Sequence, residues 1–235
     1  SLAVVWIAKG DIHKIAERYE VALQNYEIAS SYSLEDWKGY YKQGVVLYYL
    51  GRLDDAQSAL EVAAEKQPHQ SGINHFLGLV YLGKNNPTIA KLYFSKASEI
   101  DSSNSDIYFH LGQSHRHLKQ FEQARIALGN AVRIDSTHKE ALYALGQVYT
   151  KLDLNDEAKG VLKRFKVISD FEKTEKKLKK KLSLKPSDSD IRRQLALLYE
   201  SRKDYLSAAE IWQQSYFLGD GKAATELERI KGKIK

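Results

Sequence analysis

A period of 34 residues runs through most of the sequence and limits what the chain can fold into. Glycine recurs at this spacing, at Gly10, Gly44, Gly78, Gly112 and Gly146. Twelve residues after each glycine stands an alanine, at Ala22, Ala56, Ala90, Ala124 and Ala158. Four residues later comes a large apolar or aromatic side chain, at Tyr26, Leu60, Phe94, Leu128 and Leu162. Three columns that keep one period over five copies predict an array of similar structural units.

Each unit is predicted to contain two helices. Apolar residues recur at helical spacing, as at Leu142, Leu145 and Val148. Polar residues interrupt each unit near its middle and divide it into two helices. Pro87 follows one of these breaks, at a position where the second helix can start. The chain has only 3 prolines and 14 glycines, which favours long helices over a loop-rich β protein. Glycine and alanine on facing helices would let two backbones approach closely.

Two copies carry a fuller motif, namely Leu77, Gly78, Tyr81, Ala90, Phe94 and Ala97, and Tyr108, Leu111, Gly112, Ala124, Leu128 and Ala131. This pattern resembles the tetratricopeptide repeat family. The resemblance implies an all-α, right-handed α-solenoid of six helix-turn-helix units with a C-terminal capping helix, forming a single superhelical domain over residues 1–235. It also implies a non-catalytic scaffold that binds protein partners. The predicted copies are 3–36, 37–70, 71–104, 105–138, 139–172 and, after an insertion, 189–222.

The sixth copy is out of step with the others. Ala196 takes the place of the glycine and lies 50 residues after Gly146, so 16 residues are inserted, at about 169–185. Either the second helix of copy five continues through the insertion, or it breaks near Ser169 and Asp170, where a new helix could be capped. Residues 222–233 are predicted to form the capping helix, which would cover the core face of the last copy.

The resemblance implies that the first helix of each copy lines a concave groove, with positions 2, 5, 9 and 12 facing it. From these positions we select as candidate peptide-binding residues Tyr41, Tyr48, His75, Phe109, Gln113, Arg116, Tyr143 and Gln147. Four aromatic rings at position 5 form a ladder that offers contact area at low entropy cost. Glutamine amides can bond the backbone of an extended peptide. The alternative is that the rings pack between neighbouring units.

The net charge of +6 is concentrated near the C-terminal end. Residues 172–185 hold seven lysines and two glutamates, and residues 229–235 add four more positive charges. The lysine run from Lys173 to Lys181 is interpreted as a solvated helix; contact with an anionic membrane surface is the alternative. Base-stacking aromatics do not alternate with these lysines, so specific nucleic-acid binding is not expected.

Catalytic chemistry is not predicted. The sequence has no P-loop, no dinucleotide-binding turn, no HExxH motif and no nucleophile elbow. Because cysteine is absent, disulfides, thiolate metal sites and a cysteine nucleophile are excluded. His110 and His117 lie two turns apart and could bind a metal, but His115 occupies a core column, so we expect packing. No catalytic residue, cofactor or metal is therefore predicted.

The leading functional hypothesis is a scaffold that binds a peptide or helix segment of a partner in the groove. The alternatives are self-association, and a targeting or regulatory region of a larger protein or enzyme, which the start at Ser1 rather than methionine favours. The lysine, asparagine and arginine set with which some family members clamp a terminal carboxylate is absent, so that motif is not expected as a ligand. No apolar run approaches about 20 residues, so we expect a soluble chain. The lack of cysteine suits the cytoplasm and the periplasm alike.

Overall fold

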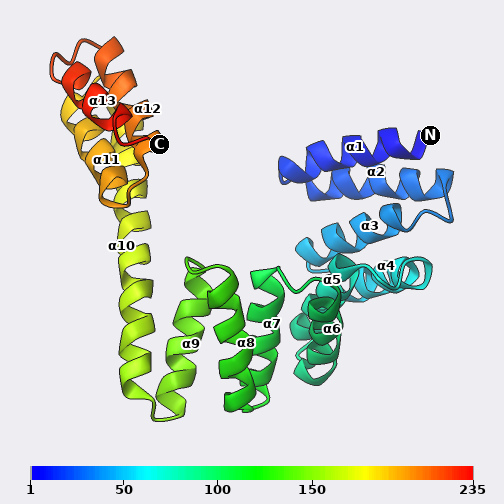
Figure 1. The fold of residues 1–235 in the computed structure, drawn as a ribbon. Coiled ribbons are helices and arrows are strands. Elements are labelled where there is room, and N and C mark those ends of the chain that lie inside the picture. The colour runs from blue at the N-terminus through cyan, green and yellow to red at the C-terminus, as the bar shows by residue number, and fades with distance from the viewer. Residues whose placement is uncertain (1, 235) are drawn as a thin grey trace. The chain divides into compact units, whose positions relative to one another are not determined.

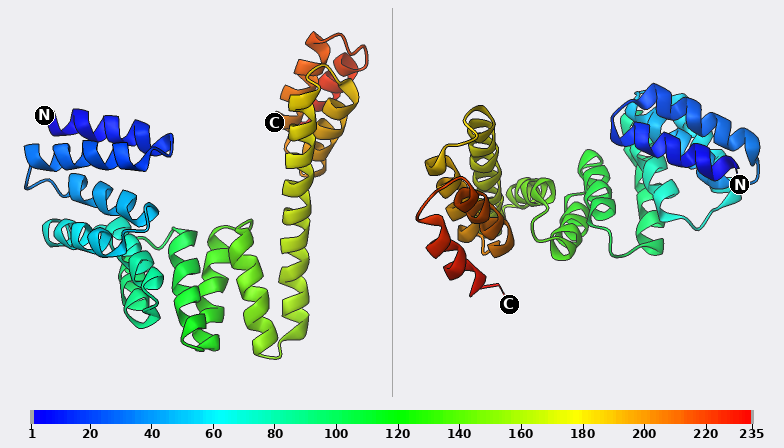
Figure 2. Two further views of the ribbon diagram at one scale, coloured as in Figure 1. Left: turned by 180° about the vertical axis from the view of Figure 1, so that it is seen from behind. Right: turned by 90° about the horizontal axis from the view of Figure 1, so that it is seen from above.

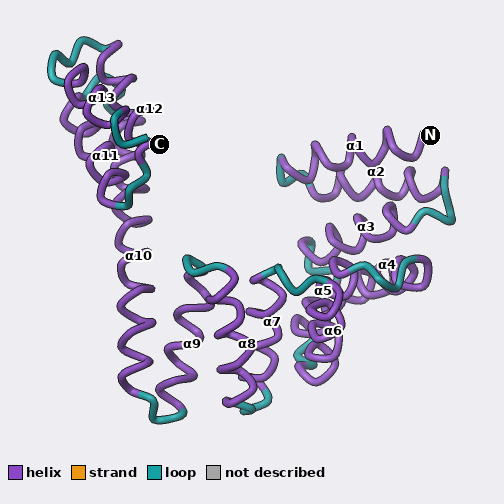
Figure 3. The backbone as a smooth tube through the Cα atoms, viewed as in Figure 1, coloured by secondary structure: helices purple, strands orange, loops and turns teal. Residues whose placement is uncertain are grey.

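The computed structural model describes residues 2–234 and is all-α (Figures 1 and 3). Its helices are α1 (Leu2–Ile15), α2 (Tyr19–Tyr32), α3 (Trp37–Tyr49), α4 (Leu53–Lys66), α5 (Ser71–Gly83), α6 (Pro87–Ile100), α7 (Ser105–His117), α8 (Phe121–Ile134), α9 (Lys139–Lys151), α10 (Asn155–Leu184), α11 (Ser189–Ser201), α12 (Tyr205–Phe217) and α13 (Ala223–Lys231). They form successive antiparallel pairs, so the predicted repeat solenoid of six helix pairs with a capping helix is confirmed. The chain divides into two compact units, one ending at Leu162 and the other beginning at Lys163.

The glycine column explains the close packing within each hairpin of the first unit. A Cβ atom added at Gly44, Gly78, Gly112 or Gly146 would lie 2.5–2.6 Å from the large side chain of the same copy, which is far closer than van der Waals contact. The two helices of a hairpin therefore approach at a distance that only glycine permits. The large residue sixteen positions after the glycine fills the space that the missing side chain leaves.

The turn inside each hairpin also repeats. One residue of this turn adopts a positive φ in every copy, at Glu17, Gly51, Asn85, Lys119, Asp153 and Lys203. The φ values lie between 56° and 75°, in the left-handed region that favours glycine. Gly51, Asn85 and Asp153 are of types that favour this region, but Glu17, Lys119 and Lys203 are not, so in those three copies the turn geometry is set by the two helices that it joins. Asn86 follows one of these turns and caps α6 by accepting a hydrogen bond from the Ile89 N–H at 3.2 Å, with Pro87 in the first turn as predicted.

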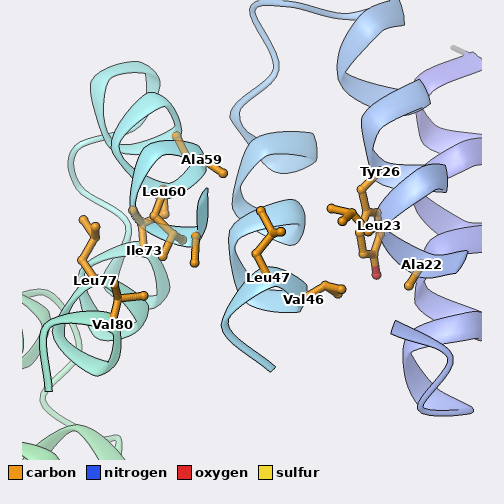
Figure 4. Packing of buried hydrophobic residues seen from close by; sticks show 12 residues of the cluster. Ala22, Leu23, Tyr26, Val46, Leu47, Ala59, Leu60, Ile73, Leu77 and Val80 are labelled. Atoms are coloured by element: carbon orange, nitrogen blue, oxygen red, sulfur yellow. The ribbon is translucent and has the colours of Figure 1, made fainter. Parts of the chain in front are cut away.

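The core of the first unit is shared between neighbouring hairpins. Figure 4 shows Val46 and Leu47 of α3, with Leu23 and Tyr26 of α2 on one side and the α4 and α5 side chains on the other. Tyr26 is completely buried, and its hydroxyl donates to Asp11 Oδ1 at 2.7 Å. Since each hairpin buries its apolar face against the next, the hairpins stabilise one another.

The inserted segment forms part of one continuous helix, α10, which has 30 residues (Figure 2). This is the first of the two alternatives that the sequence left open; no break occurs at Ser169 and Asp170. In the second unit, the stripe of Phe171, Leu178 and Leu182 packs against α11 and α12. The capping helix α13 buries Ala223 and Ile230 completely in the same core.

Candidate peptide-binding groove

The first helices of the hairpins form one continuous wall in residues 2–162. Each of α1, α3, α5 and α7 contacts the first helix of the next hairpin. The second helices α2, α4, α6 and α8 make no such contact with one another in this unit. Because the first helices lie closer together, the stack curves around them, and they line its inner face.

Tyr41 and Tyr48 occupy this wall between α3 and α5. The Tyr41 ring lies 5.9 Å from the rings of both Trp37 and Phe76, and the Tyr48 ring lies 6.0 Å from that of Phe76. Burial raises the pKa of both hydroxyl groups, so both rings remain neutral. These two candidate residues are half-buried and join neighbouring hairpins.

His75 and Phe109 belong to a second aromatic cluster, farther along the wall. The His75 ring lies 5.2 Å from that of His110, and the Phe109 ring lies 5.0 Å from that of His138. His138 Nδ1 accepts from the Ala141 N–H, so its Nε2 carries the proton and donates to Asp106 Oδ1 at 3.1 Å. In this cluster, too, the rings are partly buried between successive first helices.

Burial favours the uncharged form of two rings of this cluster, those of His75 and His110. Burial, followed by the neighbouring imidazole of His75, lowers the pKa of His110 to about 4. Burial also lowers the pKa of His75, and the Asp106 carboxylate opposes this shift. The buried Nε2 of His75 has no hydrogen-bond partner among the described residues. Protonation of either ring would place a charge among aromatic side chains.

The polar candidates meet at a single arginine. Arg116 Nη1 donates to Gln113 Oε1 at 2.6 Å, and Nη2 donates to Gln147 Oε1 at 2.7 Å. Gln113 is on α7 together with Arg116, whereas Gln147 is on α9, so this network joins two hairpins. Partial burial lowers the pKa of the Arg116 guanidinium, which nevertheless stays charged.

A pocket of about 410 Å³ opens beside this network. Its lining residues are Gln113, Arg116, His117, Phe121, Gln147, Val148, Thr150 and Lys151. His117 and Lys151 share one position of the repeat, and Phe121 begins α8. The positions implied by the resemblance did not include these residues, but two basic residues at one repeat position are visible in the sequence.

The eight candidate residues therefore divide into three sets. The structure brings Gln113, Arg116 and Gln147 together at the pocket. It packs the rings of copies two to four between neighbouring first helices. Tyr143, on α9, forms the third set by itself, because its side chain is 46% exposed. That these eight residues bind a peptide remains a prediction.

The remaining candidates occupy other surroundings. His110 stacks on Phe94 with ring centres 5.5 Å apart, whereas His117 is exposed, and His115 Nδ1 pairs with Gln120 Oε1 at 2.8 Å. Within residues 2–234, no group of three or more histidine, aspartate or glutamate side chains could hold a metal ion.

The lysine run lies on the outer side of α10. Lys179 pairs with Glu175 at 2.7 Å, as the i,i+4 spacing predicts, and the Tyr199 hydroxyl donates to the same carboxylate. Leu178, within the run, is buried in the core of the second unit. One face of the helix is thus used for packing, and the lysines cover the solvent side, where the solvated-helix interpretation and the membrane-contact alternative both require them.

Comparison with known proteins supports the same fold. The family model described as "Tetratricopeptide repeat" matches residues 7–71, and the model described as "Anaphase-promoting complex, cyclosome, subunit 3" matches residues 84–165. No curated protein matches the chain in sequence. The fold defines a solenoid of helical hairpins with an inner wall, and the chain is a tetratricopeptide repeat protein.

Solved structures of MamA share this fold. One MamA crystal structure has a TM-score of 0.63 and 18% identity, and the match covers 68% of this chain and 94% of MamA. A second, MamA 41-end from Desulfovibrio magneticus RS-1, has a TM-score of 0.65 and 17% identity, with 72% and 95% covered. At such identities the likeness concerns the fold alone. Among the helices of residues 2–234, none combines the length and apolarity needed to span a bilayer.

Proposed function

We propose that the chain is a non-catalytic scaffold that binds a peptide or helix segment of a partner protein on its inner wall. Tetratricopeptide repeats generally mediate protein–protein interaction. The observation that supports this assignment is the pocket between α7 and α9, since candidate residues from two successive hairpins line it. Side chains contributed by adjacent repeats can contact successive residues of one bound segment.

The chemistry of this part of the wall suits a peptide. Tyr143 offers an exposed aromatic face beside two glutamine amides. Aromatic rings bind apolar side chains, while amides bond backbone N–H and C=O groups. The rings that pack between hairpins, such as Tyr41 and Phe109, would hold the wall rigid. Binding of a partner would therefore cost the wall little conformational entropy.

Site-specific photocrosslinking tests the location of the partner. A benzophenone amino acid replaces Tyr143 on the inner wall in one protein. In the matched control it replaces Ile126, an apolar residue of α8 that is 58% exposed and lies on a second helix. We expect the variant at residue 143 to crosslink a partner protein in extracts of the native host, and the control to crosslink little of it.

Crosslinking of the same partner from residue 126 but not from residue 143 would contradict the inner-wall assignment. The Tyr143→Ala variant supplies a second readout. It should weaken binding to the crosslinked partner about tenfold, the typical loss of an interface aromatic, while its helical circular dichroism stays unchanged. Unchanged affinity would also count against the proposal.

Self-association is a second candidate function, favoured by an apolar face on α1. Leu2, Val5, Ile12 and Ile15 recur at helical spacing, and all are more than half exposed. A second copy of this chain could cover such a face. Light scattering over a concentration series tests this function, and a monomer at every concentration would exclude it.

A further inference from the structure

Most polar side chains of the pocket beside Arg116 are hydrogen-bond donors; the exception is Thr150, whose hydroxyl donates to the Gly146 carbonyl and leaves its oxygen as an acceptor. Arginine cannot accept a hydrogen bond, so the amide oxygens of Gln113 and Gln147 must face the guanidinium. The amide NH2 groups of both glutamines are consequently the ends left for a ligand. The ammonium group of Lys151 and the ring of His117 add further donors to the lining.

Arg116 keeps most of its binding capacity. A guanidinium has five N–H donors, and the two glutamines use two of them. Among residues 2–162, no acidic residue lines the pocket. The pocket is therefore rich in positive charge and donors, and poor in acceptors.

We propose that this pocket binds the carboxylate of a glutamate or aspartate side chain of the bound segment, with Arg116 as the central contact. The inference rests on the proposed function, because it assumes that a peptide lies on the inner wall. A planar guanidinium suits a carboxylate in a two-point contact, and the glutamine NH2 groups reach the same oxygens from either side. Phe121 and Val148 provide apolar walls for the methylene groups of the acidic side chain and for its neighbour.

This site differs from the terminal-carboxylate clamp that the sequence excludes. The residues of that clamp would lie near Tyr41, Val45, Phe76, Asp106 and His110. Arg116 is near the end of α7, and its ligand would be an internal acidic side chain.

Helix dipoles explain the positive charges around the pocket but not the hydrogen bonds that hold Arg116. Arg116 and His117 are in the last turn of α7, and Lys151 is in the last turn of α9, where positive charge is favourable. That effect does not require two glutamines to hold one guanidinium across two hairpins. The bonds to Gln113 and Gln147 fix the direction of the guanidinium, as a preorganised binding site requires.

Two capped heptapeptides serve as probes: Ser-Gly-Phe-Glu-Phe-Gly-Ser and its twin with glutamine in place of glutamate. Each is titrated into the full chain while the side-chain N–H resonances of Arg116, Gln113 and Gln147 are followed by NMR. We expect the glutamate peptide to shift these resonances and to bind at least about tenfold more tightly than its twin, as a charged hydrogen-bonded pair provides. Raising the salt concentration should weaken only the glutamate peptide.

Variants at the pocket separate its charge from its geometry. Arg116→Gln should abolish the difference between the two peptides, and Arg116→Lys should restore only part of it, because an ammonium lacks the fork of donors. Lys151→Gln should reduce the difference less. Circular dichroism confirms that each variant is folded. Arg133→Gln, on the second helix α8, is the matched control and should leave both affinities unchanged.

The possible failures are distinguishable. Equal binding of the two peptides on the inner wall would overturn the carboxylate pocket while leaving the proposed function intact. If neither peptide nor free N-acetylglutamate shifts the Arg116 resonance, the pocket does not bind carboxylates. A shift caused by inorganic phosphate but not by N-acetylglutamate would assign the pocket to phosphate groups and would overturn the proposal as well.

Discussion

The hairpins before Leu162 and the last hairpin, in the unit after Lys163, meet the same packing requirement with different residues. In the first unit, glycine lies directly against a leucine, phenylalanine or tyrosine in each hairpin. In the second unit, Ala196 stands in the glycine column and Trp212 fills the opposing position, and both are buried. The largest of the opposing side chains, tryptophan, thus occurs together with alanine rather than with glycine.

A polar anchor accompanies this difference. The Trp212 indole N–H donates to Glu200 Oε1 at 3.1 Å, and Arg229 of α13 pairs with the same carboxylate at 2.7 Å. Glu200 is one turn beyond Ala196 on α11, so the indole is held at a defined position in the hairpin. The comparison teaches that a hairpin can bury a methyl group together with an indole at the two positions where the first unit pairs glycine with a smaller side chain.

The largest expected effect comes from filling a close contact in the first unit. Gly112→Val would push side-chain atoms into Leu128, and we expect it to lower the free energy of unfolding by about 3 kcal/mol. Urea denaturation measures this. The control is Gly129→Ala in α8, where an added Cβ meets nothing within 4 Å, so stability should rise by up to about 1 kcal/mol. A similar loss in both variants would show that backbone flexibility, not close packing, maintains the column.

The second prediction concerns acid, and it also separates the two units, because all seven histidines precede Leu162. The pKa of His110 is lowered to about 4, so between pH 6.5 and 4 the unfolded chain binds a proton that the folded chain does not. Stability is therefore complete above pH 6.5 and decreases as the pH falls toward 4. We expect the first unit to lose about 2 kcal/mol over this range, measured by urea denaturation at several pH values.

A variant without the imidazole checks this assignment. His110→Phe should remove most of the pH dependence, since Phe76 already occupies the equivalent position of the preceding copy. His69→Gln, at an exposed turn, should retain it. An unchanged decrease in His110→Phe would contradict the role of this ring and would direct attention to His75, whose pKa burial also lowers.

The smallest expected loss of stability comes from a substitution in the second unit. Ala196→Gly should destabilise that unit by about 1 kcal/mol, because glycine is unfavourable inside a helix and the buried methyl group is lost. Hydrogen exchange at α11 and α12 would report this loss. If Ala196→Gly stabilised the unit, the alanine would be a strained substitute for glycine, and the two units would share one spacing.

Much of this fold could be predicted from the sequence, because the repeat is a local pattern. The glycine, alanine and large-residue columns predicted the helix pairs, whereas the sequence left open whether the inserted segment continues α10 or breaks it. The candidate groove could be predicted from the sequence only in part. The sequence placed Gln113, Arg116 and Gln147 on one wall but could not reveal that one guanidinium joins the two amides, since that depends on the distance between α7 and α9.

The sequence by itself determined the hairpin array, because a 34-residue period of small and large residues satisfies a helix pair and few other structures. Only the tertiary structure decided which rings are packed between hairpins, where Arg116 points and which residue of each turn takes a positive φ. The turn column holds Glu17, Lys119 and Lys203, residues without a preference for that backbone. Their conformation follows from the closely packed helices on either side, and such closeness is a property of two segments together that neither segment encodes alone.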